Sequence, residues 1–123
     1  MNLAAALLVV DDDEGNRYTL AGRLKREGYT NVTMANDGRQ ALQLLHSRRF
    51  DLVLLDIMMP ELNGYQVLEH LKASPELRHV PVIMITTEGG ESKVMEAVQL
   101  GASGYVRKPF TADQIKEKLA GLF

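Results

Sequence analysis

The stretch "LLVVDDDEGNR", Leu7–Arg17, runs four apolar residues directly into four acidic ones. A short apolar run that ends in charged residues is typical of a buried strand whose polar end lies at the edge of a sheet. The runs "DLVLL" at 51–55 and "PVIMI" at 81–85 are likewise continuously apolar and do not alternate with polar residues. Strands buried on both faces of a parallel sheet have this pattern, so these runs predict the centre of such a sheet.

Segments with helical periodicity separate the apolar runs. Strands are expected at Ala5–Val10, Asn31–Ala35, Asp51–Leu55, Pro81–Ile85 and Ser103–Val106. Apolar residues at helical spacing follow each strand, and in the fourth helix they are Val94, Met95 and Val98. This alternation predicts an α/β fold of the type (βα)5. The parallel sheet is expected to be doubly wound, with five strands and with helices on both faces.

The bulk composition excludes several classes of protein. The chain has 123 residues, 46% of them hydrophobic, which fits a single domain over residues 1–123. A formal net charge of -2 provides no basic field, so no direct binding to nucleic acid or to a membrane surface is expected. The absence of cysteine excludes disulfides and thiolate catalysis and fits a reducing compartment such as the cytoplasm.

The N-terminal segment "MNLAAALLVV" is interpreted as part of a buried strand and not as a signal peptide. It lacks a basic region and runs directly into acidic residues. The longest apolar run of the chain is also well short of the ~18 to 20 residues that a membrane span needs.

Polar residues follow the predicted strands at their carboxyl ends, which is where ligands bind in such sheets. Asp11 and Asp12 follow the first strand, Asp56 the third, Thr86 the fourth and Lys108 the fifth. At roughly 5 Å and an effective dielectric constant of about 20, each pair of carboxylates repels by about 3 kcal/mol. A bound divalent cation relieves this repulsion, and an all-oxygen set of ligands suits Mg²⁺. An Asp beside a metal, a Lys and a Thr is well placed to accept a phosphoryl group.

Several longer motifs occur in a fixed order, namely "VVDDDEGNR", "DLVLLDIMMPELNGYQVL", "PVIMITT" and "GASGYVRKPF". Counted from Asp56, Thr86 lies 30 residues later, Tyr105 lies 49 later and Lys108 lies 52 later. In these motifs and spacings the chain resembles, over essentially its whole length, the receiver domain of two-component response regulators. Its motifs "TTEGGESKVMEA" and "GASGYVRKPFT" are similar to those of single-domain, chemotaxis-type members, whereas "DDDEGNRYTLAGRLKREGY" is more similar to receivers attached to cyclases or other output enzymes. The resemblance implies a flavodoxin-like fold with strand order 2-1-3-4-5.

The resemblance also implies roles for the acidic residues. Asp56 is expected to be the phosphoacceptor, which receives a phosphoryl group from a histidine of a partner kinase. Asp11 and Asp12 are expected to bind Mg²⁺, for which Mn²⁺ can substitute, with Asp56 and the backbone carbonyl of Met58 as the remaining protein ligands.

Three further residues have roles that the resemblance implies. Thr86 is expected to be the switch hydroxyl that moves to the phosphoryl oxygen. Lys108 is expected to pair with Asp56 and then with the phosphate, and Lys108–Pro109 is expected to be a cis peptide. Tyr105 is expected to be an aromatic switch on the face made by the fourth helix, the fifth strand and the fifth helix.

Some of these residues, and several others, can be explained by a structural role without any role in catalysis or binding. Asp13 and Glu14 are expected to open the first helix, as a cap and by interaction with the helix dipole. Thr86 can be a β-branched residue that ends a strand, and Tyr105 can simply pack its ring. Pro60 and Gly64 are expected to be structural and to turn the loop after Asp56. The three histidines, His46, His70 and His79, lack the spacing of metal ligands, so no metal or catalytic role is expected for them.

Three other functions fit the sequence less well. A nucleotide- or flavin-binding domain needs a glycine-rich turn after the first strand, where this chain has acids. An aspartyl-phosphate phosphatase has an Asp two residues after its nucleophile, where this chain has Met58. A pseudo-receiver, which would act only through protein contacts, does not need the complete acidic set with Lys108. The expected role is a phosphoacceptor that assists its own phosphorylation and dephosphorylation and is not an enzyme.

The expected partners are a sensor histidine kinase or phosphotransfer protein, and a downstream protein or output domain. The chain ends one helix after "KPF", which leaves no room for an output domain. It is either a stand-alone regulator or a receiver cut from a longer protein with a cyclase or another output domain. The paired charges that support dimers of DNA-binding regulators are missing from the last two helices, so a monomer or weak dimer is expected.

Overall fold

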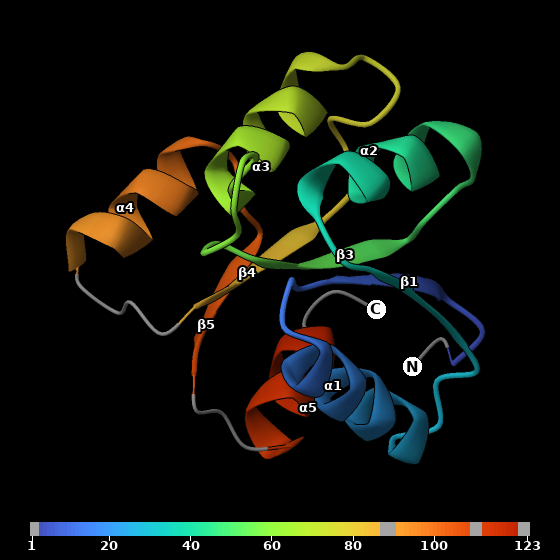
Figure 1. Ribbon diagram of the computed structural model, residues 1–123. Coiled ribbons are helices and arrows are strands. Elements are labelled where there is room, and N and C mark those ends of the chain that lie inside the picture. The colour runs from blue at the N-terminus through green and yellow to red at the C-terminus, as the bar shows by residue number, and fades with distance from the viewer. Residues whose placement is uncertain (1–2, 87–90, 109–111, 121–123) are drawn as a thin grey trace.

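The computed structural model describes residues 3–86, 91–108 and 112–120, in which strands and helices alternate along the chain (Figure 1). The strands are β1 (Ala6–Val10), β2 (Asn31–Ala35), β3 (Leu52–Asp56), β4 (Val82–Thr86) and β5 (Gly104–Arg107). The helices are α1 (Glu14–Arg26), α2 (Gly38–Ser47), α3 (Gly64–Ala73), α4 (Glu91–Gln99) and α5 (Ala112–Ala120). None of the helices within the described ranges is long and apolar enough to cross a membrane.

The strands form one parallel sheet in the order β2-β1-β3-β4-β5, which confirms the predicted fold class and strand order. Figure 1 shows α1 and α5 on one face of the sheet and α2, α3 and α4 on the other. Because all strands run the same way, the carboxyl ends of β1, β3 and β4 lie at one edge. This edge is therefore where the polar residues that end the strands come together.

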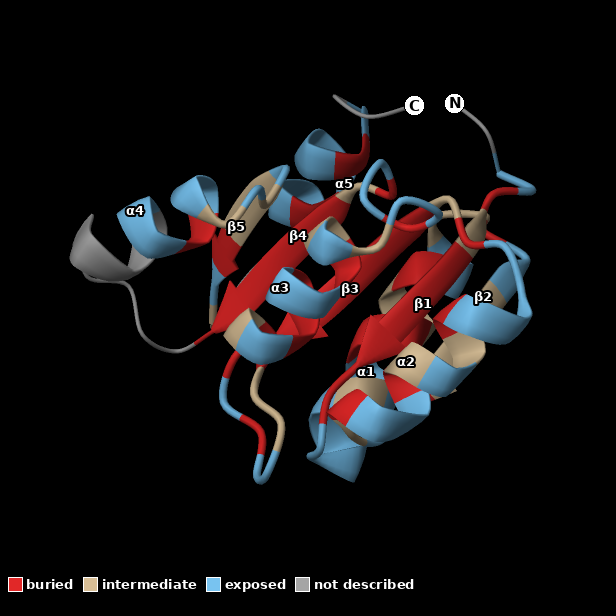
Figure 2. Cartoon of the chain, turned by 90° about the horizontal axis from the view of Figure 1, so that it is seen from above, coloured by how far each residue is buried: buried red, intermediate tan, exposed pale blue. Residues whose placement is uncertain are grey.

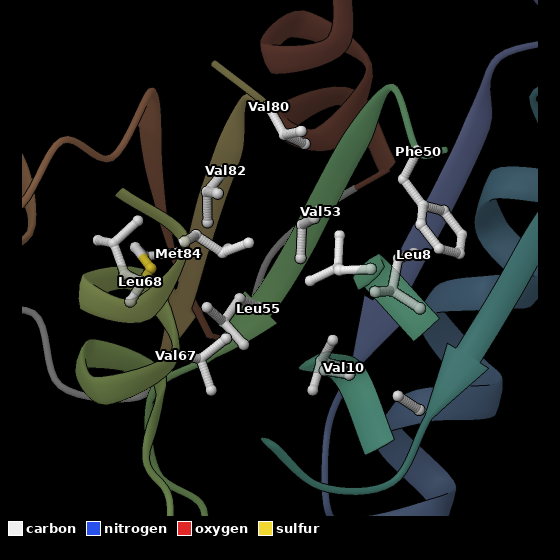
Figure 3. Close-up of a cluster of buried hydrophobic side chains, with 14 of the residues drawn as sticks. Leu8, Val10, Phe50, Val53, Leu55, Val67, Leu68, Val80, Val82 and Met84 are labelled. Atoms are coloured by element: carbon white, nitrogen blue, oxygen red, sulfur yellow. The ribbon is translucent and has the colours of Figure 1, made fainter. Parts of the chain in front are cut away.

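The central strands β1, β3 and β4 supply side chains to two separate hydrophobic cores, one on each face of the sheet, and are buried at every residue except Ala6 (Figure 2). Alternate residues of β1 and β3 point to opposite faces, as the strand repeat requires. Leu8, Val10, Val53 and Leu55 belong to the core beneath α2 and α3, whereas Leu7, Val9, Leu52 and Leu54 belong to the core beneath α1 and α5. Figure 3 shows the first of these cores, in which the β3 and β4 side chains lie opposite Val67 and Leu68 of α3.

The strands β3 and β4 begin and end one residue later than the sequence predicts, so each includes the polar residue that ends it. Asp56 pairs with Ile85 in the β3–β4 ladder, and Thr86 pairs with Arg107 in the β4–β5 ladder. Backbone pairing with a neighbouring strand does not depend on the polarity of the side chain, so the ladder continues past the last apolar residue. The backbones of Asp56 and Thr86 are therefore held by the sheet and not by a loop.

The start of α1 follows the sequence prediction. The Asp13 carboxylate accepts a hydrogen bond from the backbone N–H of Asn16 at 2.9 Å, and Glu14 lies in the first turn. This is the usual position and role of an N-cap, which satisfies a free N–H group at the helix start. Asp13 thus opens the helix, as expected.

The prediction for the buried face of α4 is wrong at the two residues that can be tested. Met95 and Val98 are exposed, with 52% and 58% of their surface accessible, whereas Ala97 is completely buried. The side of α4 that faces the sheet therefore carries the small Ala97, and the larger apolar residues Met95 and Val98 face outward. The side chain of Val94 lies outside the described residues.

The loop between β3 and α3 folds back tightly onto the end of β3. The backbone N–H of Gly64 donates to the carbonyl of Ile57 at 2.9 Å, and Glu61 has a left-handed backbone with φ of 64°. A Cβ atom on Gly64 would lie 2.6 Å from the carbonyl oxygen of Asp56 and 2.7 Å from Cα of Ile57. Glycine is therefore required at position 64 by close approach to the backbone that carries Asp56.

Gly64→Ala is expected to destabilise the protein by about 1 to 3 kcal/mol, because the methyl group must displace the Asp56–Ile57 backbone. Gly22→Ala is the matched control, since no heavy atom of the described residues lies within 4 Å of the added Cβ. In the middle of α1, alanine is expected to stabilise by about 0.5 to 1 kcal/mol through helix propensity. Urea unfolding followed by circular dichroism measures both changes, and a neutral Gly64→Ala would contradict the close approach.

Candidate functional site

Three carboxylates meet at the carboxyl edge of the sheet. Asp11 and Asp12 follow β1, Asp56 ends β3, and one carboxylate oxygen from each lies within 4.8 Å of the others. Asp11 and Asp56 are buried, with 4% and 6% of their surface accessible, and Asp12 is exposed. The parallel pairing of β1 with β3 brings these residues together, as the sequence predicts.

Lys108 provides the positive charge of the cluster. Its Nζ atom lies 2.8 Å from Oδ2 of Asp11 and 3.7 Å from Oδ1 of Asp56. The backbone N–H of Lys108 donates to the carbonyl of Thr86, which fixes the chain just after β5. With only 15% of its side chain accessible, Lys108 lies between the two buried carboxylates and compensates part of their charge.

Asp11 is oriented by contacts that the sequence alone does not reveal. Its Oδ1 atom accepts a hydrogen bond from the backbone N–H of Asp13 at 2.9 Å. Nη1 of Arg17, one turn into α1, donates to the backbone carbonyl of Asp11 at 2.8 Å. Asp13 therefore both caps α1 and holds Asp11, and Arg17 is a supporting residue that has no sequence signature.

The electrostatic environment of Asp56 disfavours its ionised form. Burial, followed by the negative charge of Asp11 and a hydrogen bond between the two carboxyl groups, raises the pKa of Asp56 to about 7. The charge of Lys108 and a hydrogen bond from the Met58 backbone act in the opposite direction but do not cancel the rise. Near pH 7 the protonated and the ionised forms of the Asp56 carboxyl group are therefore both populated when no metal is bound.

The ligand set of the cluster fits a hard divalent cation. All donor atoms are carboxylate oxygens, which suit Mg²⁺ or Mn²⁺ and not a thiophilic metal. Burial and the neighbouring charge of Asp11 raise the pKa of Asp56, and a bound cation would instead favour its ionised form. The exposure of Asp12 leaves one side of the cluster open to water and to ligands.

The other predicted residues take different positions around this cluster. The side chain of Thr86 is completely buried at the end of β4. Tyr105 is half-buried in β5, opposite Met84, and so lies two residues before the pair formed by Thr86 and Arg107. The Met58 side chain is 55% accessible on the loop after Asp56. Thr87, which follows Thr86 in the sequence, and the cis peptide expected at Lys108–Pro109 lie outside the described residues.

A hollow of about 720 Å³ opens beside the acidic cluster. Its lining includes Asp12 and Met58 from the cluster side, Asn63 and Tyr65 at the start of α3, and Glu96 from α4. Sequence reasoning did not find the last three residues. Glu96 in particular could not have been found, because only the packing of α4 brings it to the loop after β3.

Comparison with known proteins assigns the chain to the same family that its sequence motifs resemble. Residues 7–120 match the family model described as the response regulator receiver domain. The chain is 41% identical to the chemotaxis protein CheY of Pseudomonas aeruginosa over 95% of this chain and 94% of that protein. It is 40% identical to CheY-3 of Vibrio cholerae over 100% of this chain and 95% of that protein.

Solved structures agree with the sequence matches. The structure of CheY4 from Vibrio cholerae superposes with a TM-score of 0.90 at 31% identity, covering 98% of this chain and 99% of that one. The receiver domain of the Francisella response regulator 1452 superposes with a TM-score of 0.88 at 28% identity, covering 96% and 95% of the two chains. These matches confirm the resemblance that the sequence motifs indicate.

Asp56→Asn is expected to stabilise the metal-free protein at about pH 8 and to have little effect near pH 4. The pKa of Asp56 is raised from 3.8 to about 7, so the native protein loses stability as the pH rises between these values. Asparagine does not ionise, and its advantage in free energy of unfolding should grow over this interval to on the order of 2 to 4 kcal/mol.

Urea unfolding in the presence of a chelator, at several pH values, measures this difference. Excess Mg²⁺ should reduce the advantage of asparagine at high pH, because a bound cation favours the ionised carboxylate. An advantage of equal size at low and high pH would contradict the electrostatic explanation.

Proposed function

The chain belongs to the response regulator receiver domain family, and on this premise we propose that it is a phosphorylation-dependent switch of a two-component phosphorelay. In this proposal Asp56 accepts a phosphoryl group from a phosphohistidine of a sensor histidine kinase or a phosphotransfer protein. The modified domain then changes its affinity for a downstream protein.

The observation that carries the proposal is the arrangement of Asp56 beside Asp11, Asp12 and Lys108. Without a bound cation Asp56 would be a poor nucleophile, because burial and the charge of Asp11 raise its pKa to about 7 even with Lys108 beside it. A cation and Lys108 on its flanks favour the ionised form that can attack phosphorus. The same positive groups then lie beside the oxygens of the phosphoryl group, where its negative charge develops.

In the transfer step, an Asp56 carboxylate oxygen attacks the phosphorus atom of the donor. The new bond joins phosphorus to this oxygen, and the bond between phosphorus and the imidazole nitrogen breaks. Lys108, which lies 3.7 Å from Asp56 Oδ1, shifts its contact from the carboxylate to a phosphoryl oxygen. Mg²⁺ held by Asp11, Asp12, Asp56 and the Met58 carbonyl would neutralise charge on the transferring oxygens.

The switch step starts from the added charge of about −1.5 to −2 on the modified Asp56. We assign Thr86, buried at the end of β4, as the hydroxyl that moves toward the phosphoryl group. Tyr105 in β5 then changes its position, and the surface formed by α4, β5 and α5 changes with it. The exposed Met95 and Val98 of α4 support this surface as a docking face, since they offer apolar area to a partner.

In this proposal the protein is a signalling component and not an enzyme, because it is itself the phosphoacceptor. It functions in the cytoplasm, as a monomer or weak dimer, without direct contact with nucleic acid or membrane. Similarity to CheY proteins over nearly their full length favours a chemotaxis-type regulator.

Two alternative functions have some support. A receiver domain of a longer regulator, with a cyclase or another output domain, would use the same site. A pseudo-receiver would act through protein contacts without phosphorylation, and the complete acidic set with Lys108 argues against it.

Incubation with a small-molecule phosphodonor and Mg²⁺ is expected to add one phosphoryl group, about 80 Da, to the native chain. The adduct should be absent without Mg²⁺ and absent in Asp56→Asn. Intact-mass spectrometry provides the measurement. An adduct that survives in Asp56→Asn would refute the site, and a native chain without any adduct would favour the pseudo-receiver.

Replacing Met58 by a smaller or polar residue is expected to change the rate of dephosphorylation about tenfold, or about 1.4 kcal/mol in activation free energy. Met58 is exposed beside Asp56 and lines the adjoining hollow, so it controls the access of water and donor to the phosphoryl group. Decay of the adduct, followed by intact mass, gives the rate. Leu3→Ala is the control, because this exposed apolar residue precedes β1, at the end of the sheet opposite the acidic cluster. Equal rates in the native chain and the Met58 variants would contradict the proposal.

A further inference from the structure

Two histidines that are distant in sequence meet on the surface of the α2–α3 layer. His46 lies in the last turn of α2 and His70 in the last turn of α3, 24 residues later. Their Nε2 atoms are 3.2 Å apart, and their rings are nearly perpendicular, with an interplanar angle of 84° and centroids 5.5 Å apart. Figure 1 shows these two helices side by side on the same face of the sheet.

The spacing of the two nitrogens is close to that of neighbouring ligands on one transition-metal ion. Two nitrogens at about 2.05 Å from a metal, at a tetrahedral angle of about 109°, lie about 3.3 Å apart. Both side chains are exposed, so the rings have room to tilt until both lone pairs point to one position. The backbones of α2 and α3 therefore need no rearrangement to form a two-histidine site.

The position of the pair at two helix ends also favours a cation. The last carbonyl groups of a helix carry partial negative charge, which attracts positive charge within the last turn. Here the last turns of both α2 and α3 carry a histidine of the pair. An ion bound between the rings would benefit from both helix ends at once.

The sequence spacing of His46 and His70 predicts no metal role, but the packing of α2 against α3 brings their rings together. We propose that the two histidines form a second metal site, which binds a late divalent transition metal such as Zn²⁺, Ni²⁺ or Cu²⁺. Imidazole nitrogen is a ligand of these ions and a poor ligand of Mg²⁺. In the described part of the chain, the only group of three metal-ligating side chains is the acidic cluster, so the histidine site has two protein ligands. Water or a group from a partner completes the coordination.

Such a site would cross-link α2 to α3 without involving the phosphoacceptor. The two helices pack on the same core, and a metal bridge between their ends binds the folded state but not the unfolded chain. Metal binding should therefore raise the melting temperature of the domain. This inference does not depend on the proposed phosphorylation, because neither histidine belongs to the acidic cluster.

The test is a titration of the native chain with Zn²⁺ by isothermal calorimetry, in excess Mg²⁺ so that the acidic cluster is saturated. We expect one Zn²⁺ per chain, and at least a tenfold loss of affinity in His46→Gln and in His70→Gln. His79→Gln is the matched control, because it removes the remaining histidine of the chain from a separate exposed loop and should leave the affinity unchanged. Zn²⁺ should raise the melting temperature of the native chain and of His79→Gln, but not of the other two variants.

Asp56→Asn separates the two metal sites. It should keep its Zn²⁺ affinity if the histidine pair binds the ion, and lose it if the acidic cluster does. Native affinity in His46→Gln or His70→Gln, an equal loss in His79→Gln, or no Zn²⁺ binding in the native chain would each overturn the proposal. In NMR spectra, Zn²⁺ should shift the ring signals of His46 and His70 and not those of His79.

Discussion

The buried contact of Lys108 with Asp11 and Asp56 is the interaction on which the functional edge of this domain depends. Two carboxylates in a nearly dry environment repel each other, and burial adds to the cost of ionising them. One ammonium group, 2.8 Å from the first and 3.7 Å from the second, offsets only part of this cost. The remaining excess of negative charge is the physical basis of the proposed binding of a cation and of a phosphoryl group at this edge.

The rest of the fold keeps this contact in place. Asp11 and Asp56 follow or end strands that are buried on both faces, and Lys108 is tied through its backbone to Thr86 at the end of β4. The loop after Asp56 is pressed so closely against β3 that position 64 has no room for a side chain. Two helices on the same face of the sheet differ in character: α3 buries its apolar stripe, whereas α4 leaves Met95 and Val98 exposed. The acidic cluster thus lies at the ends of buried strands, whereas α4 presents exposed apolar side chains.

The sequence predicted the structure best in the strands whose residues are buried one after another. The runs around Val10, Leu55 and Ile85 predicted the central strands, and the polar residues that follow them predicted the acidic cluster. The prediction failed for α4, because helical periodicity identifies an apolar stripe but does not decide which side packs on the sheet. Burial of the small Ala97 turned Met95 and Val98 outward. The positions of Arg17 and Glu96 also escaped prediction, since each depends on how a helix packs against another element.

The sequence by itself determined the order of strands and helices, the edge at which functional residues gather, and the identity of Asp56, Asp11, Asp12 and Lys108 as its charged members. Local patterns suffice for this, because the strand period and the right-handed crossover leave few arrangements open. Only the tertiary structure decided the pKa of Asp56, the orientation of Asp11 by Arg17, and the meeting of His46 with His70. These properties arise from distances between groups that are remote along the chain, and such distances exist only once the helices have packed on the sheet.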